Sequence, residues 1–161
     1  MVRGILSFRE RFQGYEDKYV IIGGTACDLL LSEEGLEFRA TKDIDLVLII
    51  EAIDEDFGKV FWNYVAEARY EHWNKSSGGP QFYRFTNPKS DEYPKMIELF
   101  TRKADAIILP KDVEISPLHI SDSISSLSAI LLDNDYYSFL QNGRVSVDGG
   151  YCFGCCVFDS F

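Results

Sequence analysis

Two short motifs near the amino end carry residues that could handle phosphate and a divalent cation. Gly23-Gly24-Thr25 follows the apolar run Tyr19–Ile22, a pattern typical of a strand that enters a tight glycine turn and then a helix. Such a turn directs backbone N–H groups and the positive helix end at an anion. Downstream, Asp43 and Asp45 project to the same side of a strand because strand side chains alternate. Carboxylates held so close repel each other unless a divalent cation lies between them.

A third acid, Glu98, interrupts the apolar run Met96–Phe100. An uncompensated charge in a core-facing strand is strongly unfavourable, and a metal ion would compensate it. If this strand lies beside the strand of Asp43 and Asp45, the three acids converge at one end of the sheet. Two other interpretations stay open: Glu98 turns out to solvent, or it pairs with Arg84 or Arg102.

The hydrophobic pattern indicates the elements that must position these acids. The predicted strands are Tyr19–Ile22, Ile44–Ile50 and a hairpin of Gln81–Thr86 with Met96–Thr101. The predicted helices are Thr25–Ser32, a segment with apolar positions from Phe57 to Ala68 behind the N-cap Asp54, and Ser123–Gln141, bent near 133–135.

Length and composition favour one globular domain. The chain has 161 residues, 46% hydrophobic and 14% aromatic, enough to bury one core. The net charge of -10 argues against broad, non-specific binding to nucleic acid. No apolar stretch approaches the roughly 20 residues that span a bilayer, so we expect no membrane association and a cytoplasmic location.

The last residues differ in composition from the rest, so we divide the chain into a domain at 1–149 and an atypical tail at 150–161. The tail holds Cys152, Cys155 and Cys156, a spacing that does not suit structural zinc, which takes four ligands in two separated pairs. Read one nucleotide later, its codons can encode an apolar, strand-like segment. We therefore predict that the tail is an out-of-frame end of a longer ancestral chain.

Together the motifs resemble the signature of the DNA polymerase β-like nucleotidyltransferase superfamily. The resemblance rests on Gly23-Gly24-Thr25, on the acids within Thr41-Lys42-Asp43-Ile44-Asp45-Leu46, and on the later strand acid Glu98. Within the superfamily the chain is most similar to the AbiEii/AbiGii-type toxin nucleotidyltransferases, in which a Gly-Gly-Thr-Ala turn, an intervening arginine and Asp-x-Asp are typical. The resemblance extends from Tyr19 to Arg102.

The resemblance implies an α+β fold in which a small mixed β-sheet, flanked by helices, binds metal and a nucleoside triphosphate at one edge. It implies transfer of a nucleoside monophosphate to a hydroxyl acceptor on RNA, a protein or a small molecule. It is also consistent with the toxin of a toxin–antitoxin pair, whose partner would be an antitoxin protein.

In such a reaction a hydroxyl attacks the α-phosphorus in line, and Mg²⁺ (or Mn²⁺) stabilises the charge on the phosphoryl oxygens. The expected metal ligands and catalytic acids are Asp43, Asp45 and Glu98. The expected nucleotide contacts are Gly23, Gly24, Thr25, Arg39 and Lys42, although ordinary surface charges stay an alternative for Arg39 and, more strongly, for Lys42.

The chain also departs from that family. The toxins carry a later helical region with a lysine that helps to hold the nucleotide, and no equivalent precedes the tail. A second function therefore stays open: a catalytically inactive, truncated remnant that binds nucleotide or a partner protein.

Overall fold

The computed structural model describes residues 2–37, 41–49, 53–72, 81–101, 118–119, 134–142, 144–147 and 150–153. Its helices are α1 (Ile5–Arg11), the 3-10 helix η1 (Glu16–Lys18), α2 (Gly23–Glu33), α3 (Glu55–Ala68) and α5 (Asn134–Asn142). Its strands are β1 (Tyr19–Ile22), β2 (Asp43–Leu48), β3 (Glu71–His72), β4 (Gln81–Thr86), β5 (Met96–Thr101), β6 (Leu118–His119), β7 (Arg144–Val147) and β8 (Gly150–Phe153). None of the described helices is long and apolar enough to cross a membrane.

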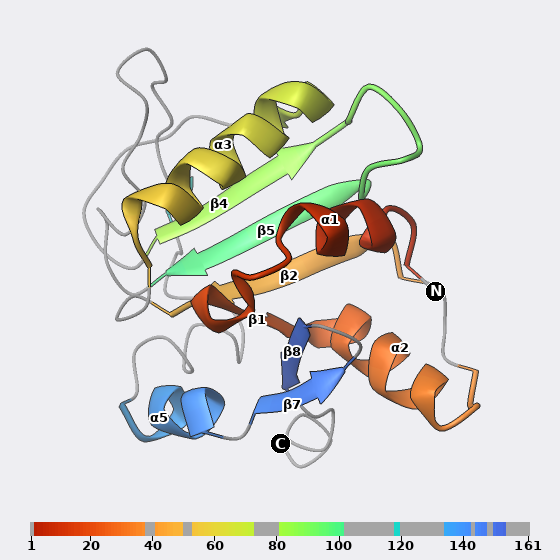
Figure 1. Cartoon of the computed structure of the whole chain (residues 1–161), viewed down its shortest axis with the longest axis vertical. Helices are drawn as coiled ribbons and strands as arrows, with labels where there is room; N and C mark the ends of the chain where they lie inside the picture. Colours follow the sequence, from red (N-terminus) through yellow and green to blue (C-terminus); the bar gives the residue numbers. More distant parts are fainter. Residues whose placement is uncertain are drawn as a thin grey trace.

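The described strands form one mixed sheet in the order β3-β4-β5-β2-β1-β8-β7, with β6 paired to β4 (Figure 1). β2 lies between β1, to which it is antiparallel, and β5, to which it is parallel. This arrangement confirms the expected α+β class with a mixed sheet flanked by helices. The parallel pairing of β2 with β5 matters most for the site, because it joins the two strands that carry the acids.

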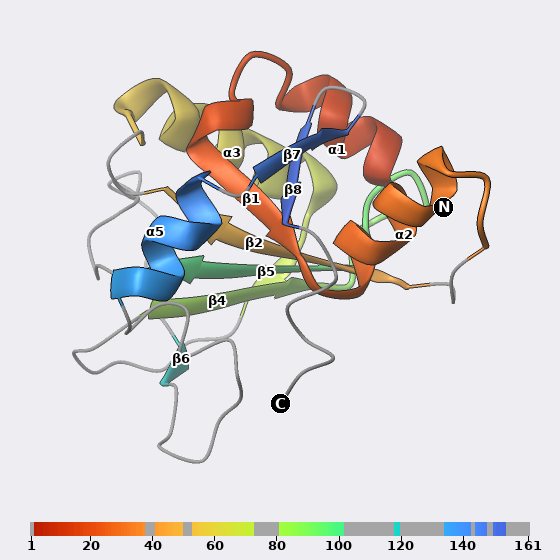
Figure 2. The same cartoon turned by 90° about the horizontal axis from the view of Figure 1, so that it is seen from below.

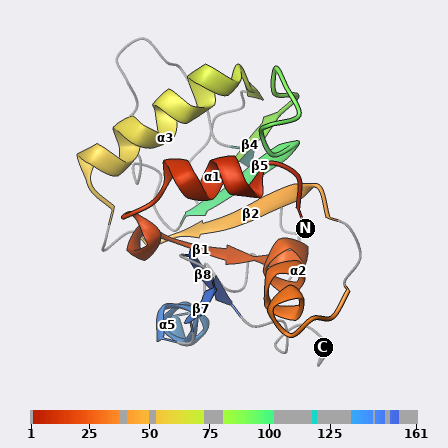
Figure 3. The same cartoon turned by 45° about the vertical axis from the view of Figure 1, so that its right-hand side comes forward.

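The main core lies on the face of the sheet that α1 and α3 cover (Figures 2 and 3). Ile44, Leu46 and Leu48 of β2 are fully buried in this core. Because side chains alternate along a strand, Asp43 and Asp45 project from the opposite face. The predicted alternation of β2 is therefore confirmed.

Several predicted elements are confirmed and others differ at their ends. The hairpin of β4 and β5 has the predicted bounds, and the Asp54 side chain caps α3 by accepting a hydrogen bond of 2.8 Å from the backbone N–H of Phe57. Helix α2 begins at Gly23 rather than Thr25, and β2 begins at Asp43 rather than Ile44. Helix α5 begins at the predicted bend, and the part of that predicted helix before residue 134 lies outside the described residues.

The segment that we separated as a tail contributes a strand to the sheet. β8 pairs in parallel with β1, where Ile21 lies opposite Cys152, and antiparallel with β7. The residues from Gly150 to Phe153 thus belong to the same sheet as the acids. The out-of-frame origin of the segment stays a prediction.

Candidate functional site

The glycine turn between β1 and α2 lies directly beside an acid. Gly23 has a φ of +66°, in the left-handed region that favours glycine. A Cβ at this position would lie 2.5 Å from Oδ2 of Asp45. Ile22, opposite Asp45 in the sheet, provides no side-chain cap for the first backbone N–H groups of α2. The turn is therefore open to a carboxylate because it lacks a side chain.

The next residues of the motif tie α2 to the start of β2. The hydroxyl of Thr25 is fully buried and donates a hydrogen bond to the carbonyl oxygen of Asp43. It also lies 3.3 Å from the hydroxyl of Thr41, whose methyl group would contact a Cβ placed on Gly24. In this structure the Thr25 side chain thus has a positioning role, and its contact with phosphate stays a prediction.

Asp45 and Glu98 meet across the parallel strands. They are opposite each other in the register of β2 and β5, and their side chains are hydrogen-bonded. Burial raises the pKa of Asp45 to about 7, and the hydrogen bond to Glu98 and the charges of Glu98 and Asp43 act in the same direction. A protonated Asp45 can therefore donate a hydrogen bond to the Glu98 carboxylate. The expectation that the strands of these acids are neighbours is confirmed.

Glu98 also pairs with Arg84, one of the alternatives raised by the sequence. Arg84 lies opposite Glu98 in the hairpin, and its Nε donates to Oε1 of Glu98 over 2.6 Å. The side chain of Glu98 is 12% exposed and that of Arg84 is 45% exposed. Arg84, Glu98 and Asp45 thus lie side by side on three adjacent strands. We call the two acids, Glu98 and Asp45, the acid row. The sequence indicated this arginine only as an alternative partner, and gave no sign that Glu98 contacts both residues.

Two predicted phosphate contacts receive no structural support. Lys42 is exposed just before β2, and Arg39 lies outside the described residues. Thr41, which the sequence reasoning did not assign, contacts both the turn and Thr25. Its place within the Thr-Lys-Asp-Ile-Asp motif was the signal that could have identified it.

The donor chemistry of the acid row fits a hard divalent cation, since carboxylate oxygens are the ligands that Mg²⁺ prefers. Burial is the main cause of the raised pKa of Asp45, and the charges of Glu98 and Asp43 raise it further while Arg84 lowers it. Within the described residues, however, no group of three or more His, Cys, Asp and Glu side chains is arranged to hold a metal ion. The fit therefore rests on the contact of Asp45 with Glu98, and participation of Asp43 stays a prediction.

The acid row makes the stability of the metal-free protein depend on pH. Folded Asp45 keeps its proton up to about pH 7, whereas its ordinary pKa is 3.8, so the folded state binds more protons between these values. We expect the free energy of unfolding to fall by about 2 kcal/mol from pH 5 to pH 7 because of this group. Urea unfolding in EDTA, with Asp45→Asn as the reference, measures it. A difference between the two proteins that is constant over this range would contradict the prediction.

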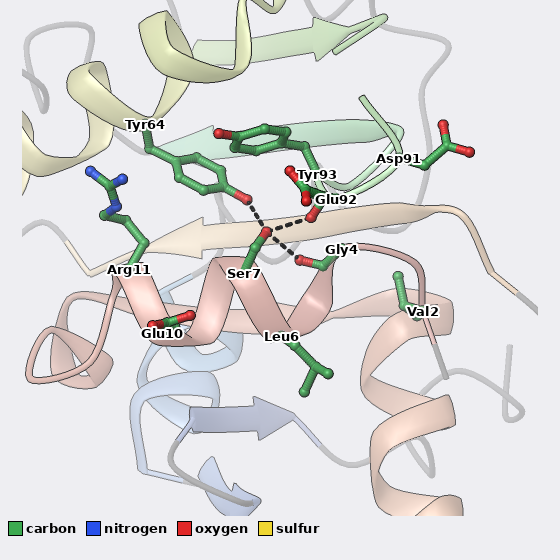
Figure 4. A pocket seen from close by; sticks show the side chains of 10 residues that line it. All are labelled: Val2, Gly4, Leu6, Ser7, Glu10, Arg11, Tyr64, Asp91, Glu92 and Tyr93. Carbon is green, nitrogen blue, oxygen red and sulfur yellow. Dashed lines mark hydrogen bonds between the residues drawn. The ribbon is translucent and has the colours of Figure 1, made fainter. Parts of the chain in front are cut away.

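A surface pocket of about 860 Å³ lies elsewhere, between α1, α3 and the loop before β5 (Figure 4). The hydroxyl of Ser7 lies 2.7 Å from the carbonyl oxygen of Glu92 and 3.1 Å from the hydroxyl of Tyr64. Arg11 on its wall pairs with Glu67. These polar groups bind one another within the fold, so we assign no chemistry to the pocket.

No protein-family model, curated protein or solved structure matches the chain with statistical significance. Function is therefore inferred from the residues of this chain and their geometry.

Proposed function

We propose that this protein transfers a nucleoside monophosphate from a nucleoside triphosphate to a hydroxyl acceptor with the help of Mg²⁺ or Mn²⁺. The observation that carries the proposal is the contact of Asp45 with Glu98 across parallel strands, beside the Gly23 turn. A polyphosphate at the turn and a cation at the acids would then be neighbours. This is the juxtaposition that phosphoryl chemistry needs.

Asp45 and Glu98 would hold the cation, with Asp43 as a further ligand, and Glu98 is also the candidate general base. When bound, the cation would supply charge stabilisation for the phosphoryl oxygens and a lower pKa for the attacking hydroxyl. The backbone N–H groups at the start of α2 would contact the phosphates. Because Asp45 must lose its proton to act as a ligand, cation binding should strengthen as the pH rises toward about 7 and level off above that value.

We propose the cationic contacts to the triphosphate and the acceptor from what the reaction requires. Arg39 and Lys42 are the proposed cationic contacts to the triphosphate. The acceptor is a hydroxyl on RNA, a protein or a small molecule. A role as the toxin of a toxin–antitoxin pair, bound by an antitoxin protein, is the biological setting that we propose for this reaction.

The direct test is label transfer from α-³²P nucleoside triphosphates to a mixture of RNA, protein and small-molecule hydroxyl acceptors. We expect transfer that requires added MgCl₂ and stops with excess EDTA. Label that appears equally with and without the metal would contradict the proposal. Separate assays with each of the four triphosphates would then identify the preferred base.

A non-catalytic remnant is the alternative, and one observation favours it. Arg84 already pairs with Glu98, so the acid row is partly neutralised within the protein. Such a protein would bind nucleotide or a partner without turnover. Saturable binding of a nucleoside triphosphate with no label transfer under the same conditions would support this alternative.

A further inference from the structure

Arg84 supplies a positive charge beside the acids of the acid row. Its guanidinium is opposite Glu98 in the β4–β5 register, and Glu98 is opposite Asp45 in the β5–β2 register. The positive charge of Arg84 also lowers the pKa of Asp45, so its field extends beyond its hydrogen-bond partner. Arg84 is therefore an internal counter-ion for both carboxyl groups.

The two members of the ion pair differ in their freedom to move. Glu98, at 12% exposure, is held between Arg84 and Asp45, and its charge needs a partner. Arg84, at 45% exposure, already extends to solvent. An arginine has a long, flexible stem, so its charged end can turn to water while the acid stays in place.

We propose that Arg84 holds Glu98 until a divalent cation replaces it, and that this competition weakens the affinity of the site for the cation. The inference rests on the proposed function, because it assumes that Asp45 and Glu98 bind the metal. It adds a positioning residue that is absent from both sequence motifs. Arg84 would act through Glu98 and would not itself be a catalytic residue.

The competition predicts a result opposite in sign to that of a purely structural role. If Arg84 only fixed the orientation of Glu98, its removal would loosen the ligand and weaken metal binding. If Arg84 competes with the cation, its removal frees the carboxylate and strengthens metal binding. Arg84→Gln removes the charge and retains polarity, whereas Arg84→Lys retains the charge.

We expect Arg84→Gln to lower the Kd for Mn²⁺ by about fivefold at pH 8, and Arg84→Lys to stay within about twofold of the unmodified protein. Electron paramagnetic resonance of free Mn²⁺ during titration measures both values. Arg11→Gln is the matched control, because it removes the same charge from an exposed pair with Glu67. Its Kd should not change.

An unchanged or higher Kd in Arg84→Gln, with Mn²⁺ still bound, overturns the role of Arg84 and leaves the proposed function standing. Absence of saturable Mn²⁺ binding in all four proteins overturns the metal site itself. If Arg84→Gln does not fold, the unmodified protein supplies the test by NMR. The Nε–H resonance of Arg84, assigned with Arg84→Lys, should move on addition of Mg²⁺, and a fixed resonance at saturating Mg²⁺ would overturn the inference.

Discussion

Asp45→Asn is expected to lower metal-dependent label transfer by about 10²–10⁴-fold and to raise the stability of the metal-free protein. Asparagine keeps the shape of the side chain and removes the charge that would hold the cation. The same charge is unfavourable in the folded state, since burial and neighbouring acids raise the pKa of Asp45 to about 7. Its removal should therefore stabilise the protein at pH 8 by on the order of 1–3 kcal/mol.

The expected loss of label transfer and gain of stability have opposite signs, so a variant that is merely misfolded would not reproduce both. Label transfer and urea unfolding are measured on the same preparations, in MgCl₂ and in EDTA respectively. Asp56→Asn is the matched control, because Asp56 lies on α3 with a side chain that is 79% exposed. It should leave label transfer unchanged and alter the stability only slightly, because its ion pair with Lys59 is exposed. Equal transfer by Asp45→Asn and the unmodified protein would reject the enzyme, and a loss of stability would show that Asp45 supports the fold as an anion.

The sequence was enough to predict that Asp43 and Asp45 project from the same face of the sheet, because the alternation of side chains along a strand is a local property. Ile44 and Leu46 alternate with Asp43 and Asp45, and one face is buried. The pairing of Asp45 with Glu98 required more than this pattern. Helix α3 and the β3–β4 segment lie between the two strands in the chain, so their register depends on packing across the whole sheet.

The contacts of the glycine turn could be predicted only in part. A strand, a tight turn and a helix follow from Tyr19–Ile22 and the two glycines, and the structure contains them. The sequence suggested that the turn is open for phosphate. The structure shows that Gly23 also accommodates the carboxylate of Asp45, and that Thr25 bonds the start of β2. Such contacts between distant residues leave no periodic signal.

The strand at Gly150–Phe153 shows a different limit. It belongs to the segment 150–161, whose cysteines and aromatic residues are unlike the preceding sequence and predict a separate tail. The structure pairs it with β1 and β7 within the sheet. Composition reports how unusual a segment is, but strand pairing depends on backbone hydrogen bonds that many sequences can make.

Gly23→Ala is expected to lower the free energy of unfolding by about 2–4 kcal/mol and label transfer by about 10²-fold. Alanine at a φ of +66° is strained, and its Cβ would lie 2.5 Å from Oδ2 of Asp45. A shift of the Asp45 carboxylate would relieve this overlap and would disturb its contact with Glu98. The pKa of Asp45, measured by ¹³C NMR in EDTA, should then fall from about 7 toward its ordinary value of 3.8.

Gly35→Ala separates the two causes, because Gly35 has a φ of +71° and no atom within 4 Å of an added Cβ. It should lose about 1–2 kcal/mol from backbone strain alone, with transfer and the pKa of Asp45 unchanged. The excess loss in Gly23→Ala is then the contribution of the Asp45 contact. If the two variants lose the same stability and the pKa of Asp45 stays near 7 in both, Gly23 serves only the backbone turn.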